Sequence, residues 1–179
     1  MNEQHAPLRA AITGIKHSGK SSAGQSAAAL LRVPFRDLDQ VICEREGVMS
    51  ARELYRAVGA ARFREIELEV AESFCSHPGS LLLAVGGGVA DNGPALAALS
   101  GSFHLVYLVE SETVLYDRIM ANGRPPFLPE SGTREAFARL YRRRDLAYRR
   151  WAHSVLEASG TIAQVAEALA SLLSGNERR

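Results

Sequence analysis

One stretch, "GIKHSGKSS" at residues 14–22, limits the possible folds more than any other part of the chain. It has the spacing of a phosphate-binding loop, which requires a strand before it and a helix after it. An apolar run at residues 8–13 and an Ala-rich stretch at residues 21–31 meet both requirements. The residues that match the pattern are Gly14, Gly19, Lys20 and Ser21. A nucleotide site in an α/β fold is therefore predicted.

The chemistry of such a loop is specific to phosphate. Glycines let backbone N–H groups surround phosphate oxygens, and the following helix adds the positive end of its dipole. Lys20 supplies a full positive charge at the terminal phosphates, and the hydroxyl of Ser21 is suited to bind Mg²⁺. The alternative is a glycine-rich helix start that binds no ligand.

Two cations, Lys16 and His17, stand where such loops often carry small residues. The pattern does not prescribe these two positions, and histidine is one of the residues enriched at left-handed backbone angles. The loop is therefore expected to bind phosphate despite them. Either the two side chains face solvent, which we favour, or they contact phosphate.

Short apolar runs alternate with helical stretches along the chain. Strands are predicted at residues 8–13, 33–37, 81–85, 104–109 and 154–157. Helices are predicted at residues 21–31, 51–58, 61–75, 111–120, 134–152 and 161–173. This alternation predicts a three-layer α/β/α fold with a five-stranded parallel sheet in the middle. We expect residues 1–179 to form a single domain with its ligand site at the carboxyl ends of the strands.

The composition argues against several other classes of protein. The 21 basic and 20 acidic residues give a net charge of +1, whereas a nucleic-acid-binding protein usually has a clear basic excess. Residues 1–7 lack the apolar segment of a secretory signal, and no apolar run is long enough to span a membrane. Cys43 and Cys75 show no pairing or metal-binding spacing. We therefore expect a cytoplasmic, monomeric protein without nucleic-acid or membrane partners.

Two carboxylates end the second predicted strand, in the sequence Asp37-Leu38-Asp39. If the backbone stays extended, both side chains point to the same side. One would then reach the Mg²⁺ and the other an acceptor hydroxyl. Equally, Asp39 would serve only as the N-cap of a helix that begins at Gln40.

Arg64 and Glu67 are three residues apart on a predicted helix, the spacing of a surface ion pair. Alternatively, Glu67 orients Arg64 toward an anionic substrate, because the arginine fork matches a carboxylate.

Three consecutive glycines, Gly86, Gly87 and Gly88, follow the third predicted strand. Ordering them costs backbone entropy. Their presence indicates close approach of a ligand to the main chain or, alternatively, an unusually tight turn.

Residues 121–132 contain three prolines and two glycines, so they are predicted to be irregular, as a mobile lid or as an inert loop. An arginine in this segment, Arg124, would neutralise charge that develops on a transferred phosphoryl group. The next predicted helix is dense in arginine from Arg139 to Arg150, and most of these side chains are expected to face solvent.

In their order, these features resemble the shikimate kinase family, within the nucleoside-monophosphate-kinase-like group of P-loop proteins. The resemblance covers residues 8–152 and rests on the P-loop, "DLD", "FREIE", "VGGGV", "GRPPF" and "RRDLAY". It implies Mg²⁺-dependent transfer of a phosphoryl group from ATP to shikimate, a small hydroxylated carboxylic acid. The product would be shikimate 3-phosphate, in aromatic amino-acid (chorismate) biosynthesis.

The resemblance also implies roles for single residues. The ATP phosphates would be bound by Gly14, His17, Ser18, Gly19, Lys20, Ser21, Ser22 and Arg124. Mg²⁺ would be bound by Ser21 and Asp37. Shikimate would be bound by Asp39, Arg64, Gly86, Gly87, Gly88 and Arg144, with helices within residues 39–75 forming the substrate-binding part. Catalysis would depend on Lys20, Asp39 and Arg124.

Two other functions are compatible with the same features. One is a kinase of this fold that acts on another small anionic polyol, such as gluconate. The other is a nucleotide-binding relative without catalytic activity.

Overall fold

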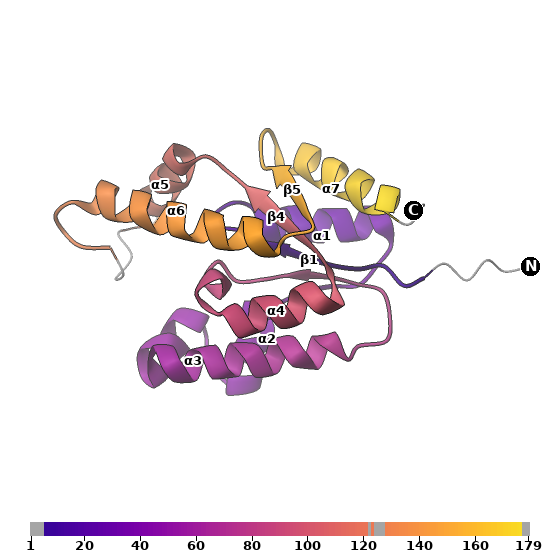
Figure 1. The fold of residues 1–179 in the computed structure, drawn as a ribbon, viewed down its shortest axis with the longest axis horizontal. Helices are drawn as coiled ribbons and strands as arrows, with labels where there is room; N and C mark the ends of the chain where they lie inside the picture. The colour runs from indigo at the N-terminus through magenta and orange to yellow at the C-terminus, as the bar shows by residue number, and fades with distance from the viewer. Residues whose placement is uncertain (1–5, 122, 124–127, 177–179) are drawn as a thin grey trace, which may run out of the picture.

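The computed structural model describes residues 6–121, 123 and 128–176, and strands alternate with helices over these residues (Figure 1). The strands are β1 (Arg9–Thr13), β2 (Phe35–Asp37), β3 (Leu81–Ala84), β4 (His104–Val109) and β5 (Ser154–Glu157). They pair in parallel as one sheet in the order β2-β3-β1-β4-β5. The predicted parallel sheet is confirmed, and each strand lies within two residues of its predicted bounds.

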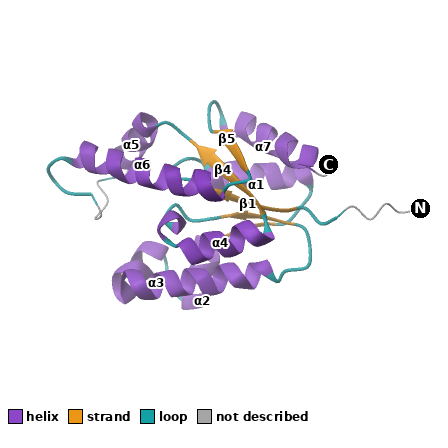
Figure 2. Cartoon of the chain, viewed as in Figure 1, coloured by secondary structure: helices purple, strands orange, loops and turns teal. Residues whose placement is uncertain are grey.

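Helices cover both faces of this sheet (Figure 2). They are α1 (Lys20–Leu31), α2 (Leu38–Glu46), α3 (Ala51–Cys75), α4 (Gly93–Ser102), α5 (Glu112–Ala121), α6 (Thr133–Trp151) and α7 (Ile162–Asn176), with a short 3₁₀ turn η1 at Val89–Asp91. The three-layer α/β/α architecture is therefore as predicted. Within the described residues, no helix combines the length and the hydrophobicity needed to cross a membrane.

Successive residues of a strand point to opposite faces of the sheet, so each buried strand packs alternate side chains against the two helical layers. On β1, Ala10 and Ile12 pack with α1 and α7, whereas Ala11 packs with the α2–α6 layer. On β3, Leu82 belongs to the first set and Leu83 to the second. The strands are therefore apolar on both faces, which explains why they read as continuous hydrophobic runs.

Helix α4 was not predicted, and α2 was expected only in the alternative in which a helix begins at Gln40. Helix α2 begins directly after β2, so the extended backbone ends at Asp37 and does not continue to Asp39. Helix α4 has no clear polar face, since its sequence is GPALAALSGS, and so lacks the periodicity that identified the other helices. Its start still carries a local signal: Asn92 accepts a hydrogen bond from the backbone N–H of Ala95, and a proline follows.

Helix α3 breaks at Gly59, whose backbone angles (φ 78°, ψ 170°) are not helical. This confirms the prediction of two helical segments on either side of that residue. Since φ is positive there, a residue with a side chain would be strained.

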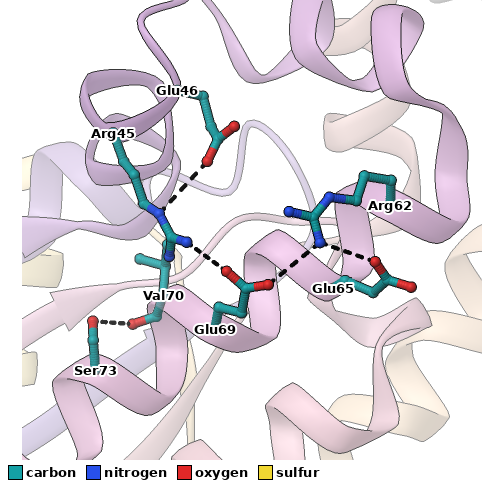
Figure 3. A network of polar contacts seen from close by, with 7 residues as sticks. All are labelled: Arg45, Glu46, Arg62, Glu65, Glu69, Val70 and Ser73. Atoms are coloured by element: carbon teal, nitrogen blue, oxygen red, sulfur yellow. Dashed lines mark hydrogen bonds and ion pairs between the residues drawn. The ribbon is translucent and has the colours of Figure 1, made fainter.

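Exposed ion pairs connect α2 with the second segment of α3 (Figure 3). Glu69 of α3 pairs both with Arg45 of α2 and with Arg62, which also contacts Glu65. Such surface pairs are weakened by salt, but several in a network orient neighbouring helices. Here they hold α2, which contains Asp39, against the part of α3 that contains Arg64.

The contact between α1 and the sheet gives a test of the packing. A Cβ added at Gly24 of α1 would lie 2.8 Å from Cδ1 of Ile12 and 2.9 Å from the ring of Phe35. We predict that Gly24→Ala lowers the free energy of unfolding by about 1–3 kcal/mol, as overpacking does. The measurement is urea-induced unfolding followed by circular dichroism. Gly101→Ala in α4, where a Cβ meets nothing within 4 Å, is the control and should leave stability equal or slightly higher. Equal stability of the two variants would contradict the packing described.

Candidate active site

The P-loop has the backbone conformation that phosphate binding requires. Positive φ angles occur at Gly14 (152°), His17 (67°) and Gly19 (90°), and α1 begins immediately afterwards. A Cβ at Gly14 would lie 2.5 Å from the carbonyl oxygen of Leu108, so only glycine fits there. The left-handed angle expected at His17 is confirmed, and its carbonyl accepts a hydrogen bond from Arg118 (3.1 Å). Lys16 is exposed and His17 is half-buried, and the preference for solvent-facing side chains at these two positions stays a prediction.

Lys20 is buried at the mouth of this loop. Its Nζ donates a hydrogen bond to the carbonyl oxygen of Ile15 at 3.0 Å. Burial lowers the pKa of Lys20 to about 8, although the nearby carboxylates of Asp39 and Asp37 favour its charged form. The ammonium group is thus held in place in a poorly solvated site, where a bound phosphate would favour its charged form.

Asp37 links the loop to the end of β2. One carboxylate oxygen accepts a hydrogen bond from the hydroxyl of Ser21 at 2.6 Å. The other accepts from the backbone N–H groups of Asp39 and Gln40, so Asp37 is the N-cap of α2. The alternative that Asp39 caps this helix is therefore wrong, because the helix begins two residues earlier than that alternative supposed.

Asp39 lies in the first turn of α2 with its carboxylate directed at the glycine turn, residues 86–88. A Cβ at Gly86 would overlap this carboxylate. Burial, with a contribution from Asp37, raises the pKa of Asp39. The side chain is therefore a confined carboxylate with increased proton affinity, close to the positive charge of Lys20.

The glycine turn also lies against the P-loop. A Cβ at Gly87 would lie 2.6 Å from the backbone nitrogen of Lys16. The carbonyl oxygen of Gly87 accepts a hydrogen bond (2.9 Å) from the hydroxyl of Tyr148, a fully buried residue of α6. Other segments of the chain approach the backbone at Gly86 and Gly87 so closely that a side chain would not fit there. In this structure the close approach is therefore made by the protein itself. In the sequence Tyr148 is only the last residue of "RRDLAY", and its contact with the glycine turn was not predicted.

Glu67 does not form the expected ion pair with Arg64. Its carboxylate is buried, 2% exposed, and accepts a hydrogen bond from Nδ2 of Asn92 at 2.8 Å. Within the described part of the chain, Arg64 has no carboxylate partner, and its side chain lines a cavity. The spacing of the two residues would allow an ion pair on the helix surface. Glu67 is instead buried against the start of α4, where its partner is Asn92.

A single cavity of about 1540 Å³ brings the predicted groups together. Its lining includes His17, Gly19, Lys20, Ser21, Ser22, Asp37, Asp39, Arg64, Gly86, Gly87, Gly88 and Arg144. Gly14 and Ser18 belong to the P-loop but do not line this cavity. Arg124 and four other residues of the expected lid (122 and 125–127) lie outside the described residues, but Leu128 of the same segment is buried and lines the cavity.

The cavity also contains more basic side chains than the sequence predicted for the site. Arg52 and Arg56 from the first segment of α3, and Arg139 and Arg143 from α6, line it as well. Arg52 and Arg56 were not considered, and the α6 arginines were expected mostly to face solvent. Basic residues therefore outnumber the acidic ones in the lining, which suits the site to anionic ligands.

Comparison with known proteins agrees with this geometry. A family model described as shikimate kinase matches residues 16–174. The shikimate kinase of Geobacter sulfurreducens is 35% identical over 138 residues, which cover 76% of this chain and 75% of that protein. The chain belongs to the shikimate kinase family. It is thus a small-molecule kinase, as predicted.

The structural similarity extends over nearly the whole chain. A solved shikimate kinase from Acinetobacter baumannii in complex with shikimate has a TM-score of 0.86 and 25% identity, covering 98% of this chain and 97% of that one. A gluconokinase from Sinorhizobium meliloti has a TM-score of 0.59 and 17% identity, covering 98% of this chain and 96% of the other. The second similarity shows the fold alone.

The buried carboxyl of Glu67 gives this family member a testable dependence of stability on pH. Burial raises the pKa of Glu67 from 4.5 to about 7, so the folded state binds this proton more tightly than the unfolded chain does. The stability that this proton provides is complete below pH 4.5 and is lost as the pH rises to about 7. Glutamine at this position cannot lose a proton.

We predict that Glu67→Gln raises the free energy of unfolding relative to the unsubstituted chain by on the order of 2 kcal/mol at pH 8, with little difference at pH 4.5. Denaturant titrations at several pH values measure this difference. Glu65→Gln, at an exposed position of the same helix, is the control and should show no such pH dependence. If the change in the free energy of unfolding caused by Glu67→Gln is the same at every pH, the raised pKa of Glu67 is contradicted.

Proposed function

We propose that this chain phosphorylates shikimate with ATP, giving shikimate 3-phosphate and ADP, and that residues 1–179 act as one domain. One observation carries the proposal: Lys20, Asp39, Arg64 and Arg144 line the same cavity. The lysine and its loop suit a triphosphate, and the two arginines with an aspartate suit a compact acid that carries hydroxyls. The relative solved with shikimate supports this choice of acceptor.

On the nucleotide side, the backbone N–H groups of the P-loop and the N-terminus of α1 would bind the phosphates. Lys20 would leave its carbonyl partner for the terminal phosphates, whose charge raises its pKa again. Because the lysine is buried, its attraction to phosphate is less screened by water than it would be at the surface.

The oxygen donors beside the loop fit Mg²⁺. The hydroxyl of Ser21 and a carboxylate oxygen of Asp37 lie 2.6 Å apart, and both are hard ligands. Among the described residues there is no cluster of three or more metal-binding His, Cys, Asp or Glu side chains. This suits an ion that completes its coordination with phosphate oxygens and water. When bound, Mg²⁺ would neutralise charge on the transferred phosphoryl group.

On the acceptor side, Asp39 would accept a hydrogen bond from the attacking hydroxyl and receive its proton. Its burial and raised pKa suit a group that takes up a proton as the new bond to phosphorus forms. Arg64 and Arg144 would bind the carboxylate and so orient the ring. Most of the catalysis would then come from positioning and charge neutralisation.

Closure of the lid would complete the site. We propose that Arg124 moves over the phosphates and that residues 121–132 exclude water from the terminal phosphate, limiting ATP hydrolysis. Among the described residues of this segment, Leu128 lines the cavity. The cytoplasmic location and the monomeric state stay predictions.

A coupled assay of ADP release with excess MgATP tests the function. We expect turnover that depends on shikimate and is absent with gluconate or without an acceptor. Absence of turnover with shikimate would overturn the proposal. Turnover with gluconate alone would favour the other acceptor, and MgATP binding without turnover on either acid would favour a non-catalytic relative.

Substitution of Asp39 tests its assigned role. Asp39→Asn should lower kcat about 100-fold or more, because the hydroxyl loses its proton acceptor, while the KM for ATP stays within about twofold. Asp117→Asn, at an exposed position of α5, is the control and should leave both constants unchanged. Equal losses of kcat and of nucleotide affinity in Asp39→Asn would contradict the role.

A further inference from the structure

Two consecutive residues, Asp91 and Asn92, contact both helices that carry the proposed carboxylate-binding arginines. They lie where η1 ends and α4 begins, a few residues after the glycine turn. Asp91 contacts α6, and Asn92 contacts α3. Neither residue belongs to the P-loop or to the groups assigned above.

Asp91 is bound by two arginines of α6. Its Oδ2 accepts from Nη2 of Arg144 at 2.7 Å, and its Oδ1 accepts from Nη2 of Arg143 at 2.8 Å. The Arg144 side chain is only 14% exposed, whereas that of Arg143 is 65% exposed. The pair with Arg144 is therefore the better shielded from water, and Asp91 holds that guanidinium in one orientation.

The held guanidinium belongs to the lining of the cavity. Its Nη2 binds Asp91, and its Nε is buried without a hydrogen-bond partner among the residues that the structure describes. Because the Arg144 side chain is still 14% exposed, an anionic group in the cavity can contact it.

Asn92 fixes the other arginine through the backbone. Its Nδ2 donates to the carbonyl oxygen of Arg64 at 2.9 Å and to the carboxylate of Glu67 at 2.8 Å. Its Oδ1 caps α4 at Ala95. Since Asn92 is only 4% exposed, these bonds hold the turn of α3 that carries Arg64 against the start of α4.

The charges are compatible with a carboxylate at this place. Asp91 is shared by two guanidinium groups, so the three side chains together keep a net positive charge. A free arginine loses considerable rotamer entropy when it binds, and one that is already held loses less. Fixing Arg144 and the Arg64 turn beforehand therefore favours binding of a carboxylate in one orientation.

We propose that Asp91 and Asn92 are positioning residues that hold Arg144 and the Arg64-bearing turn of α3 for the carboxylate of the acceptor acid. This inference rests on the proposed function, because it concerns how the same acceptor is bound. The competing explanation is that Asp91 only anchors α6 for stability.

Steady-state kinetics of Asp91→Asn with shikimate and with its methyl ester distinguish the two explanations. Asparagine keeps the size of the side chain but loses the charge that holds Arg144. We expect the KM for shikimate to rise roughly tenfold, with kcat and the KM for ATP within about twofold. The preference for the acid over the ester, as a ratio of kcat/KM, should fall by a similar factor, since the ester lacks the charge that Arg144 binds.

Asp145→Asn is the matched control. Asp145 also lies on α6 and pairs with an arginine, Arg149, but it does not line the cavity. We expect this variant to keep both the KM for shikimate and the preference for the acid. Asn92→Ser is a second test, because serine keeps the helix cap but is too short to bond Arg64 and Glu67 as asparagine does. It should raise the KM for shikimate in the same direction.

Several results would overturn the inference. An unchanged acid-to-ester preference in Asp91→Asn, or a parallel rise of both KM values, would reduce Asp91 to a structural anchor. If Asp91→Asn fails to fold, as judged by thermal unfolding, an unchanged acid-to-ester preference in Asn92→Ser would overturn it. If the unsubstituted chain shows no shikimate-dependent turnover, the proposed function fails first, and that result is distinct from a difference between variants.

Discussion

Close packing at Gly86 and Gly87 is the constraint on which the site depends. These two residues bring the end of β3 against the carboxylate of Asp39 on one side and against the P-loop backbone at Lys16 on the other. Any side chain at either position would separate the two parts, because the added Cβ would overlap them. The hydroxyl of Tyr148 binds the same turn to α6. The separation between the P-loop and the Asp39 carboxylate is thus set by close contacts of the backbone at Gly86 and Gly87.

The charges in the cavity are arranged around this contact. Lys20 is buried and Asp39 is half-buried, and each favours the charged form of the other, against the effect of desolvation. Arg144, which lines the same cavity, is held by Asp91. The site therefore contains charged groups whose positions are fixed by the protein before any ligand binds, as preorganised electrostatic catalysis requires.

Much of this could be predicted from the sequence because the signals are local. The P-loop, the two aspartates and the three glycines each occupy a few consecutive residues at the end of a strand, where a parallel sheet places its ligand site. What could not be predicted depends on contacts between distant segments. Glu67 was interpreted by its helical neighbour, whereas its partner Asn92 comes from the next helix. Asp91 belongs to no motif, and Tyr148 is only the last residue of "RRDLAY", so the roles of both follow from the residues they contact.

The central claim is that one cavity holds the phosphate donor and the hydroxy-acid acceptor face to face. A crystal structure with Mg²⁺, a non-hydrolysable ATP analogue and shikimate tests it most directly. The account predicts the shikimate carboxylate within about 3 Å of Arg64 and Arg144, and a ring hydroxyl between Asp39 and the terminal phosphate at Lys20. Shikimate bound outside this cavity, or bound in it with its carboxylate directed away from both arginines, would contradict the account.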